Sequence, residues 1–175
     1  GQSRMTSLHQ TILSLFQHRN GKIAYRLQTE AGGYRAISCG VAAEQALRLS
    51  SYLRSQGVGA GDRVMLVSEN GPEWSIAALA VLNLRAVLVP VAAIGSSLEI
   101  ENTLRSASPK FCIYSKEIAA AAYLDQLLKN ENISRSAWKL QSENPLGEWV
   151  QGQAPLAIDE LARESDTAVL IYTSG

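Results

Sequence analysis

The sequence has few residues of the kinds that build specialised sites or fibrous structures. Its 175 residues include two cysteines, two histidines, 13 glycines and five prolines. This composition excludes a disulfide framework, a collagen-like chain and a low-complexity chain. Charge of one sign is also lacking, because 16 Lys and Arg residues balance 16 Asp and Glu residues. The chain therefore has no basic field to recruit nucleic acid or anionic lipid, and we expect no nucleic-acid partner.

The scarce cysteines and histidines are not spaced as metal ligands. Cys39 and Cys112 are far apart, and the second lies in an apolar run where a thiol acts as a small hydrophobe. Both histidines, His9 and His18, lie near the N-terminus with no cysteine or third histidine nearby. We expect reduced, inert cysteines and no metal site within these residues.

Long uninterrupted hydrophobic runs are missing as well. The longest apolar stretch, residues 76–94, contains Asn83, Arg85 and Pro90, so a membrane span is not expected. Residues 6–16 lack the basic segment and the unbroken apolar core of a signal peptide. A cytoplasmic location is therefore expected. Residues 1–4, which precede Met5, resemble the remnant of an expression tag.

The residues that are present alternate between helical periodicity and short apolar runs. A chain of 175 residues suits one domain with a sizeable core. The pattern predicts α/β architecture, with a parallel sheet flanked by helices. Helices are expected near residues 6–17, 41–56, 73–84, 97–107 and 118–129. Strands are expected in a hairpin at 22–27 and 34–37, then near 63–67, 86–91, 111–114 and 168–172, with a weaker strand signal around 138–140.

Glycine-rich nucleotide motifs are missing from their usual context. The segment Gly57-Val58-Gly59-Ala60-Gly61 follows a helix and precedes a strand, the reverse of the order in a dinucleotide site. We interpret it as a tight connection. A different position draws attention, because the predicted last strand leads directly into Thr173, Ser174 and Gly175. Hydroxyls and glycine amides beyond the carboxyl end of a strand can wrap phosphate oxygens.

A series of short motifs resembles the N-terminal region of the adenylate-forming enzymes, the AMP-dependent synthetase and ligase superfamily. The motifs are Gly61-Asp62-Arg63-Val64, Asn70-Gly71-Pro72-Glu73-Trp74, Leu79-Ala80-Val81-Leu82, Val89-Pro90-Val91 and, about 80 residues later, Tyr172-Thr173-Ser174-Gly175. No single motif would suffice, but together they cover roughly residues 6–175. The resemblance is greatest to acyl-CoA synthetases, the fatty-acid–CoA ligases.

The resemblance implies a function and a division of the chain. Residues 5–175 would be the N-terminal portion of the AMP-binding domain, ending at the start of the phosphate-binding loop. Thr173, Ser174 and Gly175 would be the first ATP-contacting residues of that loop. The implied enzyme uses ATP, Mg2+ and coenzyme A to convert a carboxylic acid into an acyl-adenylate and then a thioester. The family's catalytic and magnesium-binding residues correspond to positions after residue 175, so no residue here is assigned as a catalytic group or metal ligand.

Departures from the family pattern keep other interpretations open. Asn83-Leu84-Arg85 stands where the family usually has Lys-Ala-Gly, and Val91-Ala92-Ala93 follows Pro90 where amino-acid-activating members have Ile-Asp or Leu-Asp. The alternatives are an adenylation domain for amino or aryl acids and a non-catalytic α/β binding domain. Asp62 and Asn70 are expected to be turn and cap residues rather than ligands, and Trp74 is expected to pack against the core rather than form a substrate wall.

Two further expectations follow from the implied incompleteness of the domain. The chain alone is expected to be inactive, because the phosphate loop is present only in part. Apolar surface that would otherwise meet the remainder of the enzyme is expected to drive association, so we anticipate a homodimer.

Overall fold

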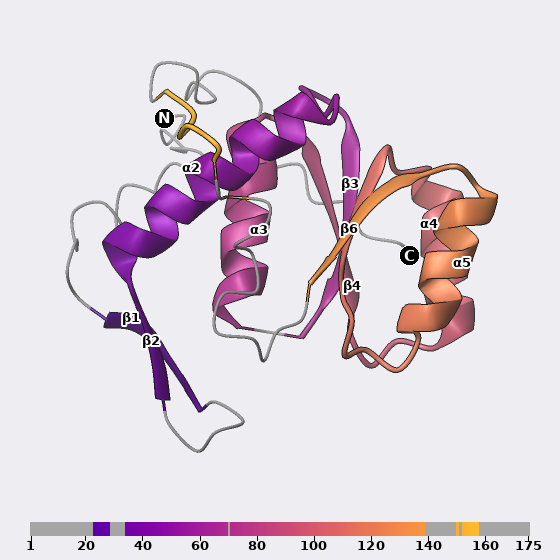
Figure 1. Ribbon diagram of the computed structural model, residues 1–175. Helices are drawn as coiled ribbons and strands as arrows, with labels where there is room; N and C mark the ends of the chain where they lie inside the picture. Colours follow the sequence, from indigo (N-terminus) through magenta and orange to yellow (C-terminus); the bar gives the residue numbers. More distant parts are fainter. Residues whose placement is uncertain (1–22, 29–33, 70, 139–149, 151, 158–175) are drawn as a thin grey trace, which may run out of the picture.

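The structure is a computed structural model that describes residues 23–28, 34–69, 71–138, 150 and 152–157. Two parts are visible: a small antiparallel hairpin and a larger four-stranded sheet with helices on both faces (Figure 1). The hairpin consists of β1 (Ile23–Gln28) and β2 (Tyr34–Ser38), as its two β-prone runs around a glycine-bearing loop predicted.

The larger part alternates helix and strand along the chain. Its helices are α2 (Cys39–Ser55), α3 (Pro72–Asn83), α4 (Ser97–Ala107) and α5 (Ala121–Asn130). Its strands are β3 (Arg63–Ser68), β4 (Val87–Ala92), β5 (Phe111–Ser115) and β6 (Ser134–Trp138). All three strand pairings are parallel, in the order β4-β3-β5-β6. The predicted α/β class and parallel sheet are confirmed.

Each face of the sheet is covered by one pair of helices. α2 and α3 lie on one side of the sheet, and α4 and α5 lie on the other (Figure 1). Strand β3 shows how the two cores divide, since Val64 and Leu66 join the α2–α3 core while Met65 and Val67 join the α4–α5 core. All four side chains are fully buried. A strand buried on both faces needs the continuous apolar run seen in this segment.

The predicted helix boundaries are explained by local hydrogen bonds. After α2, Gly57 adopts φ +91°, and the amide of Val58 donates to the carbonyl of Leu53 at 3.0 Å. This is a glycine-dependent helix end. At the start of α4, the Ser96 hydroxyl accepts from the Glu99 amide, and the Glu99 carboxylate accepts from the Ser96 amide. This capping box makes Ser96 the N-cap of the helix.

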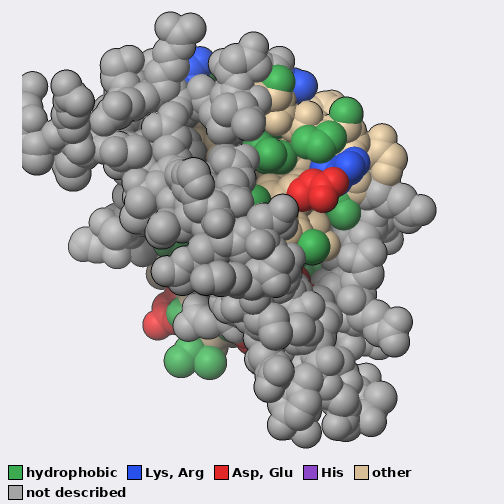
Figure 2. Space-filling model, turned by 90° about the vertical axis from the view of Figure 1, so that its left-hand side faces the viewer, with side chains coloured by type: hydrophobic (Ala, Val, Ile, Leu, Met, Phe, Trp, Pro, Cys, Tyr) green, Lys and Arg blue, Asp and Glu red, His purple; other side chains and the backbone are tan. Residues whose placement is uncertain are grey.

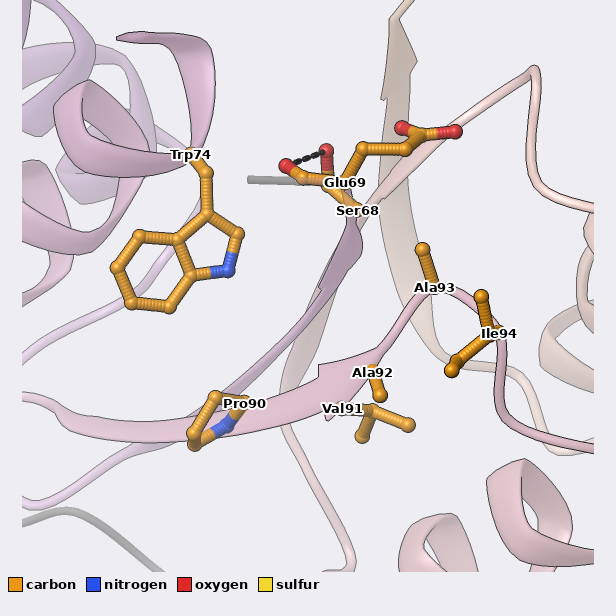
Figure 3. A pocket seen from close by; sticks show the side chains of 8 residues that line it. All are labelled: Ser68, Glu69, Trp74, Pro90, Val91, Ala92, Ala93 and Ile94. Atoms are coloured by element: carbon orange, nitrogen blue, oxygen red, sulfur yellow. Dashed lines mark hydrogen bonds between the residues drawn. The ribbon is translucent and has the colours of Figure 1, made fainter. Parts of the chain in front are cut away.

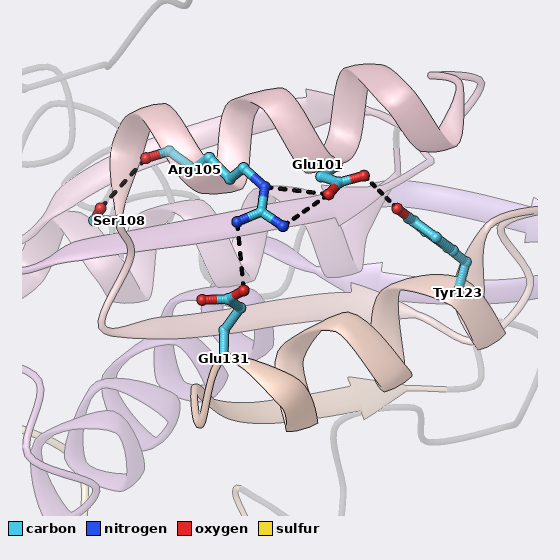
Figure 4. Close-up of polar contacts among 5 residues, drawn as sticks. All are labelled: Glu101, Arg105, Ser108, Tyr123 and Glu131. Carbon is cyan, nitrogen blue, oxygen red and sulfur yellow. Dashed lines mark hydrogen bonds and ion pairs between the residues drawn. The ribbon is translucent and has the colours of Figure 1, made fainter.

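The polar face of the α4–α5 layer carries an exposed network (Figure 4). Arg105 binds Glu101 one turn earlier on α4 and reaches Glu131 beyond α5. The Tyr123 hydroxyl donates to the other carboxylate oxygen of Glu101. These two hydrogen bonds, from Tyr123 first and Arg105 second, lower the pKa of Glu101. The network links the two helices on their solvent side, where ion pairs contribute little to stability.

Three predicted boundaries need correction. The helix expected from residue 118 begins at Ala121, because residues 116–120 form turns and the Ser115 hydroxyl accepts from the Glu117 amide. The strand expected around 138–140 is β6, which ends at Trp138. The polar residues of β6 obscured it, since a strand at the sheet edge need not be continuously apolar. Finally, β4 begins and ends one residue later than the expected 86–91 and includes Pro90, which its position at the edge of the described sheet permits.

Several predicted features lie outside the described residues. They are the tag remnant 1–4, the helix 6–17, the strand 168–172, the sequence motif residue Asn70, and Thr173, Ser174 and Gly175. Within the described ranges, no helix has the length and apolarity needed to cross a membrane.

Candidate functional site

The carboxyl edge of the sheet is the part of the described structure best placed to hold a ligand. Ser68 ends β3 opposite Ala92 of β4, and Ser115 ends β5 opposite Trp138 of β6. Since Val67 pairs with Tyr114 one position earlier, the two serines end neighbouring strands side by side. Both serines are buried.

This edge contains a topological switch point. From β3 the chain crosses through α3 to β4 on one side, whereas from β5 it crosses through α5 to β6 on the other side. The connections leave the β3–β5 pair in opposite directions and open a crevice outside the strand ends. Open α/β sheets bind their ligands at such crevices. The ligand contacts predicted from the sequence, at Thr173, Ser174 and Gly175, belong to a different strand end that lies outside the described residues.

A pocket of about 450 Å3 opens next to this crevice, between the ends of β3 and β4 and the first turn of α3 (Figure 3). Trp74 of α3 forms one wall. Pro90, Val91 and Ala92 of β4, together with the two residues that follow, form the base. Small-molecule sites are typically pockets of this size with mainly apolar walls and a few polar groups.

The polar groups of the pocket come from the end of β3. The Ser68 hydroxyl donates to the backbone carbonyl of Glu69 at 3.1 Å. The Glu69 side chain extends away from Trp74, toward the side of Ala93 (Figure 3). Its Oε2 atom is buried and has no hydrogen-bond partner among the described residues. This oxygen is therefore covered by protein atoms and does not face the pocket.

Sequence reasoning singled out Trp74 as packing rather than as a substrate wall. The structure supports packing, because the ring lies against the α2–α3 core, and it adds that the same residue borders the pocket. Ser68 and Glu69 were not singled out. The sequence signal that could have identified them is their position at the end of the buried apolar run of β3. Residues at that position lie at the carboxyl edge of a parallel sheet, where ligands bind.

Asp62 lies at the opposite end of β3 and acts as the predicted turn residue. Its Oδ2 atom accepts from the Gly59 amide at 2.8 Å and is 3.4 Å from Nζ of Lys110. The glycine-rich segment 57–61 is thus a helix-to-strand connection, and Gly61 adopts φ +79° within it. This segment is remote from the carboxyl edge.

Cys112 is not a nucleophile in this fold. The residue is fully buried in the centre of β5, on the side of α4 and α5. Burial strongly raises the pKa of its thiol, so the reactive thiolate is suppressed at neutral pH. The interpretation of this cysteine as a small hydrophobe is confirmed.

The side of the molecule that carries the hairpin and α2 is chemically mixed. Figure 2 views this side, and its described part shows acidic and basic side chains next to one another among hydrophobic ones. On α2, Nη2 of Arg48 lies 2.8 Å from Oε1 of Glu44, one helical turn away. Opposite charges placed this way support the helix and leave little net field.

Comparison with known proteins identifies the family. The AMP-binding enzyme family matches residues 15–175 of this chain. The chain belongs to the AMP-binding enzyme family. A long-chain-fatty-acid–CoA ligase of Mycobacterium bovis, FadD15, is 29% identical over 152 residues, covering 82% of this chain and 25% of the relative. The putative acyl–CoA ligase YdaB of Bacillus subtilis is 28% identical over 134 residues, covering 73% of this chain and 26% of the relative.

Solved structures of CoA ligases have the same fold. A fatty acyl CoA synthetase of Mycobacterium tuberculosis superposes with a TM-score of 0.72 at 18% identity, covering 98% of this chain and 33% of that one. A benzoate CoA ligase from Burkholderia xenovorans superposes with a TM-score of 0.71 at 23% identity, covering 86% of this chain and 29% of that one. The sheet and its helices are therefore those of the N-terminal domain of adenylate-forming enzymes. The chain spans about a quarter of the length of the curated relatives it matches.

Proposed function

We propose that this AMP-binding chain is the N-terminal part of an ATP-dependent acyl-CoA synthetase. Such an enzyme activates a carboxylic acid as acyl-adenylate and transfers the acyl group to coenzyme A, forming a carbon–sulfur bond. The observation that carries the proposal is the family match over residues 15–175. The parallel sheet with its switch point supports it, because that architecture presents ligand sites beyond the strand ends.

Within this proposal, Thr173, Ser174 and Gly175 begin the loop that holds the ATP phosphates. The two hydroxyls contact phosphate oxygens, and glycine gives the backbone the freedom to approach them closely. Bound Mg2+ supplies charge neutralisation between phosphate oxygens. The family resemblance places the magnesium-binding residue at a position after residue 175.

The proposal also covers the division and activity of the chain. Residues 5–175 form the N-terminal portion of the AMP-binding domain, and residues 1–4 are a tag remnant. The 175-residue chain alone does not catalyse adenylation, because stabilising the transition state requires several donors held together at short range. A cytoplasmic location belongs to the same proposal and is supported by the buried free thiol of Cys112.

The decisive experiment is ATP–pyrophosphate exchange with a panel of fatty, aryl and amino acids. It is run on the 175-residue chain and on a protein that continues the chain with the remainder of a ligase. We expect exchange with fatty acids by the longer protein and none by the chain alone. Exchange by the chain alone contradicts its proposed inactivity.

The same panel separates the two alternatives. If exchange occurs only with amino or aryl acids, the substrate is one of these acids rather than a fatty acid, and the proposed adenylation chemistry still holds. Failure of the longer protein with every acid, together with failure to bind ATP, favours a non-catalytic binding domain.

A further inference from the structure

We propose that β4 binds residues 168–172 of the same chain as a fifth parallel strand, along the edge that faces away from β3. That edge pairs with no strand among the described residues. The pairing would bring Thr173, Ser174 and Gly175 to the carboxyl edge of the sheet, beside the end of β4. The role of these three residues toward ATP rests on the proposed function, whereas the strand pairing does not depend on it.

The crossovers of the described sheet all have the same hand. From β3 to β4 the chain moves toward the β4 side, and the connecting helix α3 lies on the same face as α2 (Figure 1). From β4 to β5 and from β5 to β6 the chain moves the other way, and α4 and α5 lie on the opposite face. Crossovers between parallel strands are almost always right-handed. The face that a connection covers therefore fixes the direction in which the chain moves.

The chain that follows β6 lies on the face of α2 and α3. Val150 and Leu156 are buried in the α2–α3 core. The Leu156 amide donates to the carbonyl of Leu47 at 3.1 Å, and the Arg48 guanidinium donates to the carbonyl of Gln153. A right-handed connection on this face moves toward the β4 side. Because β3 and β5 already occupy the inner positions, a parallel strand reached in this way lies beyond β4.

Residues 168–172 have the composition of a strand that is buried on both faces. They form the continuous apolar run Ala168-Val169-Leu170-Ile171-Tyr172, similar to that of β3. Of the two outer strands of the described sheet, β6 contains Arg135 between two serines, whereas β4 has no charged or hydroxyl side chain. Charged residues are typical of strands that remain at an edge. Pro90 has no N–H group and costs the added pairing at most one hydrogen bond.

One row of residues across the sheet provides matched positions for a cross-linking test. Val91 of β4 pairs with Val67, Val67 pairs with Tyr114, and Tyr114 pairs with Ala137 of β6. Val91 and Ala137 are therefore the outer members of the same row, and both pack against the α4–α5 core. Neighbouring strands lie about 4.8 Å apart, a separation that a disulfide can bridge.

The variants of the 175-residue chain combine Val91→Cys or Ala137→Cys with Leu170→Cys or Ile171→Cys, all in a Cys39→Ser background. Cys112 is fully buried and is left in place. After mild oxidation, mass spectrometry of peptides identifies the linked positions. We expect position 91 to form an intrachain disulfide with either 170 or 171, because successive side chains of a strand point to opposite faces. Position 137, the matched control, should form about tenfold less.

Amide hydrogen exchange gives a second readout that needs no cysteine. Leu170→Asp places a charge in the apolar run and should increase exchange in β4 while leaving β6 unchanged. The same spectra show whether the rest of the sheet is still protected, so β6 serves as the control within one molecule. Unchanged exchange in β4 would contradict the pairing.

Each alternative arrangement gives a different disulfide and overturns the proposal. Linkage to position 137 instead of 91 would place the segment against β6. Linkage of 170 or 171 to Val87→Cys, at the start of β4, instead of Val91→Cys would indicate an antiparallel strand. Disulfides between two chains would indicate that a second copy supplies the strand. The absence of any disulfide would indicate that the segment does not join the sheet.

These readouts use neither ATP nor a carboxylic acid, so the two proposals can fail separately. A longer protein without ATP–pyrophosphate exchange would count against the ligase proposal and leave the strand pairing intact. A wrong disulfide would count against the strand pairing and leave the ligase proposal intact.

Discussion

At the scale of single residues, the Asp125 carboxylate has polar partners on three different elements. It accepts hydrogen bonds from Tyr114 of β5 and Arg135 of β6, each at 2.8 Å, and pairs with Lys129 one turn later on α5 at 2.9 Å. Lys129 first, then Arg135 and Tyr114, hold the pKa of this carboxyl well below its usual range. One side chain thereby joins two strands and a helix.

This arrangement predicts a pH-dependent stability that Asp125→Asn removes. The folded carboxyl stays ionised where an unfolded one, with a pKa near 3.9, takes up a proton. Its contribution is therefore complete above about pH 5 and is lost as the pH falls further. Because about a third of the side chain is exposed, we expect a loss of only about 1 kcal/mol at pH 7 in the variant.

The measurement is urea unfolding of both proteins at pH 7 and at a series of pH values below 5, over which the difference between their stabilities should shrink as the pH approaches the lowered pKa of Asp125. Glu44→Gln is the control, since it removes an exposed i,i+4 ion pair and should change stability little at any of these pH values. A difference that persists unchanged through the acidic series would contradict the ionic role of Asp125.

Arg85 occupies a backbone position that favours glycine. Its φ is +58°, in the left-handed region, and its carbonyl accepts from the Gly61 amide at 2.9 Å. This is the position at which the family pattern has glycine, so the departure noted in the sequence coincides with backbone strain. A side chain in this region costs energy that glycine avoids.

We therefore predict that Arg85→Gly is more stable than Arg85→Ala by about 1 kcal/mol. Both variants lose the arginine side chain, so their difference reports the backbone alone. Thermal or urea unfolding of the pair measures it. Equal stabilities would show that the turn relaxes without cost.

At the scale of elements, α4 depends on its N-terminal cap. The reciprocal hydrogen bonds between Ser96 and Glu99 are each 3.1 Å long. They give acceptors to two backbone N–H groups at the exposed start of the helix. Ser96→Ala should destabilise the chain by about 1 kcal/mol, whereas Ser96→Asp should retain most of the stability.

Chemical denaturation of the two Ser96 variants checks this prediction. Ser106→Ala, near the other end of the same helix, serves as a comparison for replacing a serine in α4 away from the cap. If the two alanine variants were equally stable, the capping box would contribute nothing measurable.

The helices and strands that could be predicted from the sequence are those defined by patterns among neighbouring residues. α2, α3 and α4 combine helical periodicity with a glycine, a proline or a serine at a terminus, so their positions could be predicted to within two residues. β6 could not, because its residues Ser134, Arg135 and Ser136 carry no apolar run. It is a strand because the edge of β5 is available to pair with it, which is a tertiary property.

At the scale of the whole molecule, exposed apolar side chains predict self-association. Ile94, in the turn before α4, is 97% exposed, and Leu98, in the first turn of α4, is 66% exposed. Apolar surface of this kind favours contact with a partner. We expect a concentration-dependent shift toward dimer that Leu98→Gln reduces. Sedimentation velocity over a wide concentration range measures it, and a monomer throughout contradicts it.

The candidate site was only partly predictable. Strand ends beyond residues 67 and 114 could be located from the apolar runs, and the rule that ligands sit at the carboxyl edge then follows. The pairing of Ser68 with Ala92, and the approach of Trp74 to both, depends on strand order and on the crossing of α3. Neither is encoded in a local pattern.

By itself the sequence determined the α/β class, the positions of most helices and strands, and the family, because periodicity, caps and short motifs are properties of neighbouring residues. The tertiary structure alone decided the order β4-β3-β5-β6, the division of the core between two helix pairs, and the pocket between β3, β4 and α3. These features come from packing between segments far apart in the chain. Their free energy depends on which faces meet and which polar atoms are buried. Both are determined only when the strands pair and the helices pack against the sheet.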